Sequence, residues 1–177
     1  MMNKFITKCL FMILLAYHGL AQAIPDNLYF HGILVSEPCV IKPGDESIRL
    51  DFGNVPDKNI YAYGRTVSEA FSINLAECDT SIGKSVNVTF SGTPSLVLPG
   101  YLALQDNSRA DGFAIGIEDE TGTFLPINTK GEKLPLSDGS TQLKFKAYLK
   151  GEPDAIAQQK IKRGPFNAIA TFKLDYE

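Results

Sequence analysis

The sequence predicts an all-β fold, an antiparallel β-sandwich of the immunoglobulin type. Three observations predict it. Apolar residues recur with a period of two in several short runs, turn-forming residues separate these runs, and two cysteines lie in the body of the chain. A period of two is typical of a half-buried strand. Many short strands with frequent turns favour a sandwich over an α/β fold.

The amino-acid composition argues against several classes of function. The chain has 177 residues, 44% apolar and 21% charged, which is enough for one domain with a core. The net charge is −3, without the basic excess of a nucleic-acid-binding protein. Two histidines and three cysteines leave little material for a metal site or a nucleophile–base pair. We therefore expect no nucleic-acid partner, no catalytic or metal-ligating residues, no cofactor and no enzymatic activity.

The first 23 residues have the pattern of a secretory signal peptide. Lys4 and Lys8 flank the start of the chain, a short apolar run follows, and Ala21-Gln22-Ala23 forms a small-x-small cleavage site. The apolar run is shorter than the about 20 residues that a membrane span needs. The sequence predicts a signal peptide over residues 1–23, with an uncleaved anchor as the alternative.

Removal of this peptide would leave two of the three cysteines, Cys39 and Cys78. In an exported chain, two remaining cysteines suggest one disulfide bond rather than two free thiols. The bond would close a loop of about 40 residues and contribute about 4 kcal/mol to stability in the chain-entropy model.

Alternation of apolar and polar residues defines the expected strands. The runs cover residues 28–34, 48–52, 71–75, 86–90, 113–117 and 143–147. Turn formers such as Pro43-Gly44-Asp45 and Ser137-Asp138-Gly139 lie between them. Residues 153–160 resemble one short helical turn, which Gly164-Pro165 would end. No repeat or linker interrupts the pattern, so we expect one domain.

The two ends of this domain are unusual. The longest alternation comes last and places one set of residues on a single face: Phe166, Ala168, Ala170, Phe172, Leu174 and Tyr176. No sequence follows it that could protect this strand with a neighbour. Residues 24–36 alternate like a strand before the first body cysteine. A spare strand and a missing strand suggest exchange between copies, although residues 28–34 could instead pair within their own sandwich.

Several motifs together carry a resemblance to a known family. The run from Asp26 to Leu34 lies shortly before Cys39, and Leu50-Asp51-Phe52-Gly53-Asn54 follows that cysteine. Gly164 is fourteenth from the end and Tyr176 is penultimate, with alternating apolar residues between them. In these features the chain resembles the subunits of the chaperone–usher pili of Gram-negative bacteria, most closely the minor or adaptor subunits of P-type or type 1-like pili.

The resemblance implies an incomplete immunoglobulin-like β-sandwich that lacks its last strand. A periplasmic pilus chaperone would lend a strand to it, and at the outer-membrane usher the N-terminal extension of a neighbouring pilin subunit would replace that strand. Residues 24–36 would be the donor-strand extension and residues 37–177 the pilin domain. The chain would be exported through the periplasm to a fimbrium on the cell surface.

The resemblance also implies roles for single residues. Leu28, Phe30 and Leu34 would insert into the neighbour, with Gly32 at a shallow pocket. Burial of three large side chains gives roughly 5–9 kcal/mol of gross driving force. The acceptor groove would be lined by Gly164, Phe166, Ala168, Ala170, Phe172, Leu174 and Tyr176. Tyr176 and the terminal carboxylate of Glu177 would meet basic residues of the chaperone.

Two other function classes stay open. A secreted or periplasmic immunoglobulin-like binding module would have a complete sandwich and be a stable monomer. A small periplasmic hydrolase is disfavoured because the sequence has neither a nucleophile elbow nor a phosphate-binding glycine loop. We expect the acidic run Glu118-Asp119-Glu120 to be a solvated turn and His31 to be an exposed polar residue.

Overall fold

The computed structural model describes residues 28–177. The chain divides between Val35 and Ser36 into two units, which are described separately. The expected signal peptide and Asp26 lie outside the described residues, so both remain predictions. Among the residues that the structure describes, no helix is long and apolar enough to cross a membrane.

In the described part of the extension, residues 28–35 form neither helix nor strand. Its side chains are exposed, with 83% of Phe30 and all of Leu34 accessible to solvent. His31 is exposed, as expected, and stacks on Tyr29 with ring centroids 5.7 Å apart. A contiguous stretch of exposed apolar side chains is typical of a segment that binds another surface.

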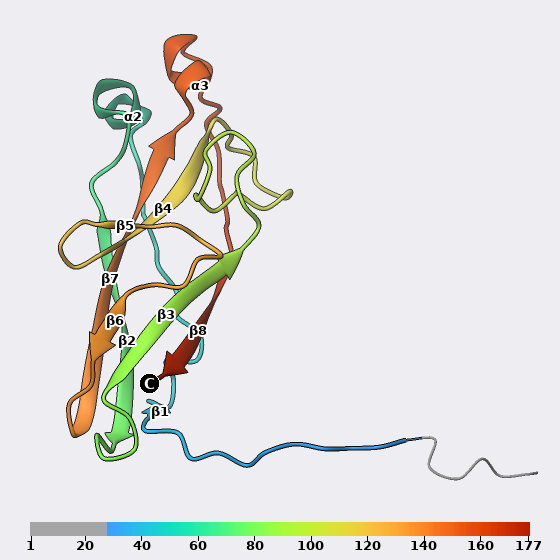
Figure 1. The fold of residues 1–177 in the computed structure, drawn as a ribbon. Coiled ribbons are helices and arrows are strands. Elements are labelled where there is room, and N and C mark those ends of the chain that lie inside the picture. Colours follow the sequence, from blue (N-terminus) through green and yellow to red (C-terminus); the bar gives the residue numbers. More distant parts are fainter. Residues whose placement is uncertain (1–27) are drawn as a thin grey trace, which may run out of the picture. The chain divides into compact units, whose positions relative to one another are not determined.

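Residues 36–177 form two antiparallel sheets (Figure 1). The larger sheet has the order β1-β2-β7-β4-β5, with bounds Val40–Ile41, Glu69–Cys78, Gly139–Gly151, Phe113–Asp119 and Phe124–Leu125. The smaller sheet has the order β6-β3-β8, with bounds Lys133–Pro135, Ser85–Gly92 and Ala170–Tyr176. This arrangement confirms the predicted antiparallel sandwich.

Four of the expected strand runs lie inside β2, β3, β4 and β7. Three runs differ. Residues 28–34 and 48–52 are not strands, and the last run becomes a strand only at Ala170. Before Ala170 the chain is not paired with β3. It is hydrogen-bonded to a loop instead, because the amides of Gln105 and Arg109 donate to the carbonyls of Asn167 and Pro165, respectively. An alternating segment becomes a strand only where its backbone pairs regularly with another strand, and these segments have no partner strand among residues 28–177.

Two short helices complete the body, α2 (Asp57–Tyr63) and α3 (Pro153–Ala157). The second is the helical turn that the sequence predicts. The first was not predicted, because seven residues are too few to establish a helical period. Its signals are Pro56 before the first turn and Gly64 after the last, where a φ of 72° suits glycine.

The core lies between the two sheets and is centred on aliphatic and aromatic side chains. Ile73, Leu75 and Val86 are almost fully buried. Phe90 packs edge-on against Phe145 with ring centroids 5.0 Å apart. Cys39 and Cys78 form the expected disulfide bond, which joins the start of the body to the end of β2.

One expectation about charged residues is wrong. Glu118 is not in a solvated turn but lies in β4 with 5% of its surface exposed. Its carboxylate accepts hydrogen bonds from Arg65 at 2.9 Å and from Ser68 at 2.6 Å. These partners come from a segment about 50 residues away, so the acidic run in the sequence could not reveal them.

Candidate functional site

The last strand of the body is a sheet edge. β8 pairs with β3 from Ala170, opposite Gly92, to Tyr176, opposite Val86. Figure 1 shows these two strands side by side. On its other side β8 has no strand partner among residues 28–177. Its free amides and carbonyls are therefore available to a further strand.

A second segment with a free backbone lies across from this edge. In residues 46–55 the apolar side chains are half-buried and alternate with exposed ones: Ile48, Leu50, Phe52 and Val55. Within the described chain this segment forms no backbone hydrogen bond with another segment. The Phe52 and Phe166 rings lie 6.0 Å apart, so the segment faces the chain that leads into β8. We call the space between these two walls the acceptor groove.

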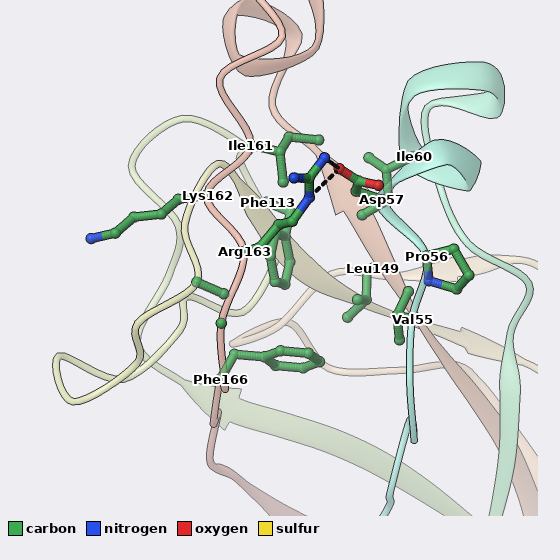
Figure 2. Close-up of a pocket in the computed structure, with 12 residues that line it drawn as sticks. Val55, Pro56, Asp57, Ile60, Phe113, Leu149, Ile161, Lys162, Arg163 and Phe166 are labelled. Carbon is green, nitrogen blue, oxygen red and sulfur yellow. Dashed lines mark hydrogen bonds and ion pairs between the residues drawn. The ribbon is translucent and has the colours of Figure 1, made fainter.

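The larger of two cavities in this groove lies at the start of the last run and has a volume of about 290 Å³. Its apolar lining comes from four separate segments of the chain (Figure 2): Val55, Ile60, Ala110, Phe113, Leu149, Ile161 and Phe166. Asp57, Lys162 and Arg163 lie at its margin. A concave apolar site of this size suits one aliphatic or aromatic side chain.

The smaller cavity lies at the opposite end of the groove and has a volume of about 210 Å³. It is lined by Glu37, Cys39, Ile41, Phe172, Leu174 and Tyr176. The Tyr176 hydroxyl donates to the Cys39 carbonyl at 3.4 Å. Burial, with a contribution from the nearby charge of Glu37, raises the pKa of Tyr176. The start of the body and the end of β8 therefore meet at this cavity.

The predicted site residues of the last run lie along one wall of the groove. Phe166, Ala168 and Phe172 are half-buried against the core, as are Leu174 and Tyr176. Ala170 is exposed although it has the same parity. An exposed small residue within an apolar row leaves the groove open above it, so this face is an unfinished core.

Gly164 lies at the margin of the larger cavity, and its place there has a steric reason. A Cβ atom on this residue would lie 2.8 Å from the Cβ of Arg109 and 3.2 Å from the amide nitrogen of Ala110. The same loop bonds the next residue, because both Arg109 and Ala110 donate to the Pro165 carbonyl. Glycine is needed because two backbones approach closely at this point.

The far end of β8 is held by ion pairs. The Glu177 side chain bonds Lys130 at 2.6 Å and Lys133 at 2.5 Å. The Glu177 carbonyl accepts hydrogen bonds from the amides of Lys84 and Ser85. The two lysines lower the pKa of the Glu177 side chain from 4.5 to about 2. These contacts keep the end of the groove wall on its sheet.

Replacing Glu177 with glutamine should therefore make stability less dependent on acid. A lowered pKa stabilises the folded chain above pH 4.5, and this stabilisation is lost as the pH falls toward 2. Because the pair is exposed, we expect a melting temperature lower by no more than about 3 °C at pH 7, with most of that difference lost near pH 2. Thermal unfolding at both pH values measures it. A difference that stays constant, or that persists in Lys130→Met/Lys133→Met, would contradict this origin.

The sequence pattern reveals neither the opposite wall of the groove nor the floor of the larger cavity. The alternation of Ile48, Leu50 and Phe52 indicated a strand, whereas the structure shows a wall that lacks its partner. The floor residues Ile60, Phe113 and Leu149 belong to three different elements. No local pattern connects them, because only the packing of the sheets brings them together.

Known proteins are similar in sequence to this chain over most of its length. The family described as Fimbrial protein matches residues 28–177. The chain is 31% identical to the fimbrial adapter PapK of Escherichia coli, covering 93% of this chain and 96% of PapK. It is 34% identical to the major MR/P fimbria protein of Proteus mirabilis, covering 84% of this chain and 82% of that protein.

Solved structures share the fold. The P pilus rod subunit PapA superposes with a TM-score of 0.68 at 23% identity, covering 80% of this chain and all of PapA. A subunit in the structure of a chaperone–usher pilus superposes with a TM-score of 0.67 at 24% identity, covering 89% of this chain and all of that subunit. The chain thus belongs to the Fimbrial protein family, whose named relatives are structural fimbrial subunits.

Proposed function

We propose that this chain polymerises by donor-strand exchange. The extension of one copy, with Leu28, Phe30, Gly32 and Leu34 facing inward, fills the acceptor groove of the next copy. The observation that carries the proposal is the groove itself, which has an unpaired backbone on both walls and an apolar floor. A strand placed there would satisfy both walls and bury the exposed apolar side chains.

The direction of the inserted strand follows from the fold. The missing last strand of an immunoglobulin-like sandwich runs antiparallel to its neighbour. In that direction, Leu34 enters the larger cavity near Phe166, and Leu28 lies toward the end of β8. Gly32 falls between them, near the small residues Ala168 and Ala170. The larger cavity is open to solvent in the described chain and is lined by apolar side chains that a leucine would cover.

Chain length supports exchange between copies, because a copy is too short to fill its own groove in this direction. The groove runs from Phe166 to Tyr176, ten residue steps or about 33 Å at the rise of a strand. Cys39 lies at the Tyr176 end, where its carbonyl is bonded by that residue. Only residues 35–38 separate Leu34 from Cys39, and they span at most about 18 Å. Leu34 cannot reach the far cavity of its own body, so the antiparallel strand comes from another copy.

The same groove makes a second partner necessary before assembly. An open apolar groove with free strand edges is an aggregation site. We propose that a periplasmic pilus chaperone covers it after export of residues 24–177, and that exchange for the next extension takes place at the outer-membrane usher. Membership of the Fimbrial protein family, together with the likeness in fold to a subunit of a chaperone–usher pilus, supports these partners. The product is a fimbrium on the cell surface.

A secreted binding module with a complete sandwich is the competing function. It would require that the free edge of β8 be closed within the same chain. The reach argument and the exposed extension disfavour it, because the apolar segment would then have no role.

A synthetic peptide of residues 24–36 tests the proposal. Added in excess to the freshly refolded full chain, the peptide should occupy the groove and block polymerisation. If its concentration is about 1,000 times its dissociation constant, binding adds about 4 kcal/mol, which raises the melting temperature by about 10 °C. Thermal unfolding and size-exclusion chromatography measure both effects.

The matched control is the same peptide with Phe30→Asp and Leu34→Asp. It keeps the length and backbone but would bury two carboxylates, so it should neither stabilise the chain nor stop polymerisation. If neither peptide changes the melting temperature and the chain is a stable monomer, the groove is closed and the competing function holds.

A further inference from the structure

The joint between two copies brings two particular surfaces together. This inference rests on the proposed donor-strand exchange. When Leu34 of an incoming copy occupies the larger cavity, Glu37 of that copy follows three residues later. Three residues span no more than about 11 Å. Glu37 of the incoming copy must therefore lie within that distance of the margin of the larger cavity, wherever its own body turns.

That margin carries positive charge. Lys162 and Arg163 line it, and Lys160 precedes them in an exposed basic run. Arg163 bonds Asp57 at 2.7 Å, but 82% of its side chain remains exposed. Lys162 forms no ion pair within the described chain, and Figure 2 shows its side chain directed away from the cavity. Lys162 therefore presents an ammonium without an ion pair beside the site where the extension leaves the groove, and its cross-strand neighbour is the exposed Asp111.

The incoming surface carries negative charge. Glu37 is exposed at the start of the body. Asp79 lies next to it, because its amide donates to the Pro38 carbonyl at 2.8 Å and the Cys39–Cys78 disulfide joins the two segments. Asp79 is exposed, and its carboxylate accepts from the Ser81 amide, which holds it at the turn. Lys84 is the exposed basic residue of the same turn region.

We propose that these surfaces form a charged joint: Glu37 and Asp79 of one copy pair with Lys162 and Arg163 of a second copy of this chain. Residues 35–37 are short enough to place Glu37 at the basic margin in every completed joint. Opposite charges at this contact favour the joint, whereas like charges would oppose it. The joint would steer the approach of the incoming copy and orient its body on the last one.

A single joint can be measured with two variants, one that can only accept an extension and one that can only donate its own. An acceptor is the full chain with Phe30→Asp and Leu34→Asp, which cannot donate. A donor is the full chain with residues 26–37 repeated after Glu177, which fills its own groove. We expect the acceptor variant Lys162→Glu/Arg163→Glu to join about tenfold more slowly at low salt, as measured by size-exclusion chromatography over time. The donor variant Glu37→Lys should restore the rate on this acceptor, and about 0.5 M salt should remove the difference.

Two controls separate the possible failures. Lys144→Glu/Lys146→Glu, on β7, makes the same charge change away from the groove and should leave the rate within about twofold. The peptide of residues 24–36 with an amidated C-terminus lacks Glu37, so charge reversal should slow its binding much less than it slows joining by the donor. If the peptide fails on the unsubstituted acceptor, donor-strand exchange itself is wrong. If the peptide binds but charge reversal has no effect, or Glu37→Lys does not restore the rate, the charged joint is overturned.

Discussion

A copy of residues 26–37 fused after Glu177 through a short flexible linker is expected to raise the melting temperature by roughly 10–30 °C. The fused strand begins beside the end of β8, so a tight connection leads it antiparallel along the groove. It buries three large apolar side chains, with a gross gain of roughly 5–9 kcal/mol. In a domain of this size, each kcal/mol corresponds to about 2–4 °C.

Thermal unfolding of the full chain and of the fusion, both at micromolar concentration, measures this effect. The fusion should also be monomeric, whereas the unfused chain should polymerise or aggregate slowly. A second fusion, with aspartate at the positions that repeat Phe30 and Leu34, keeps the length of the added segment and should not be stabilised. Equal melting of all three chains as monomers would show that the sandwich is already complete.

Removal of the disulfide bond by Cys39→Ala/Cys78→Ala should lower the melting temperature by about 8–16 °C. The two cysteines are 39 residues apart, and a loop of that size is worth about 4 kcal/mol when it is closed in the unfolded chain. Both side chains are buried, and Cys39 lines the smaller cavity. Loss of the bond would therefore also loosen the connection between the extension and the body.

Reductant provides the matched control for this prediction. Treatment of the unsubstituted chain with a thiol reductant should lower its melting temperature toward that of the variant, and the variant should not respond. Both chains should be compared with the groove filled by the peptide of residues 24–36, since polymerisation would otherwise obscure unfolding. Equal melting of the variant and the oxidised chain would mean that the bond does not constrain the unfolded chain.

The proposed exchange links the stability of a single copy to the assembly of many copies. Among the described residues, one edge of β8 and the backbone of residues 46–55 have no strand partner. In the proposed exchange, a neighbour would supply those backbone bonds, so each joint would also complete a fold. The proposal thereby accounts for an exposed apolar extension and an open groove in one chain.

The sequence by itself determined the class of fold. Alternation in residues 71–75, 86–90, 113–117 and 143–147 identified four strands, because a period of two reports directly which side of a strand faces the core. The alternation alone also predicted a last run without a neighbour on one side and a spare strand in residues 24–36. The role of that spare strand stays a prediction. These alternations are local properties, so no knowledge of distant contacts was needed.

Only the tertiary structure decided how the site is built. Ile48, Leu50 and Phe52 alternate like a strand, yet they form a wall without a partner, and Glu118 is buried against Arg65 instead of solvated. The larger cavity joins four segments that the sequence keeps far apart. Such features depend on which elements pack together, and periodicity records the face that a residue presents but not the residue that it meets.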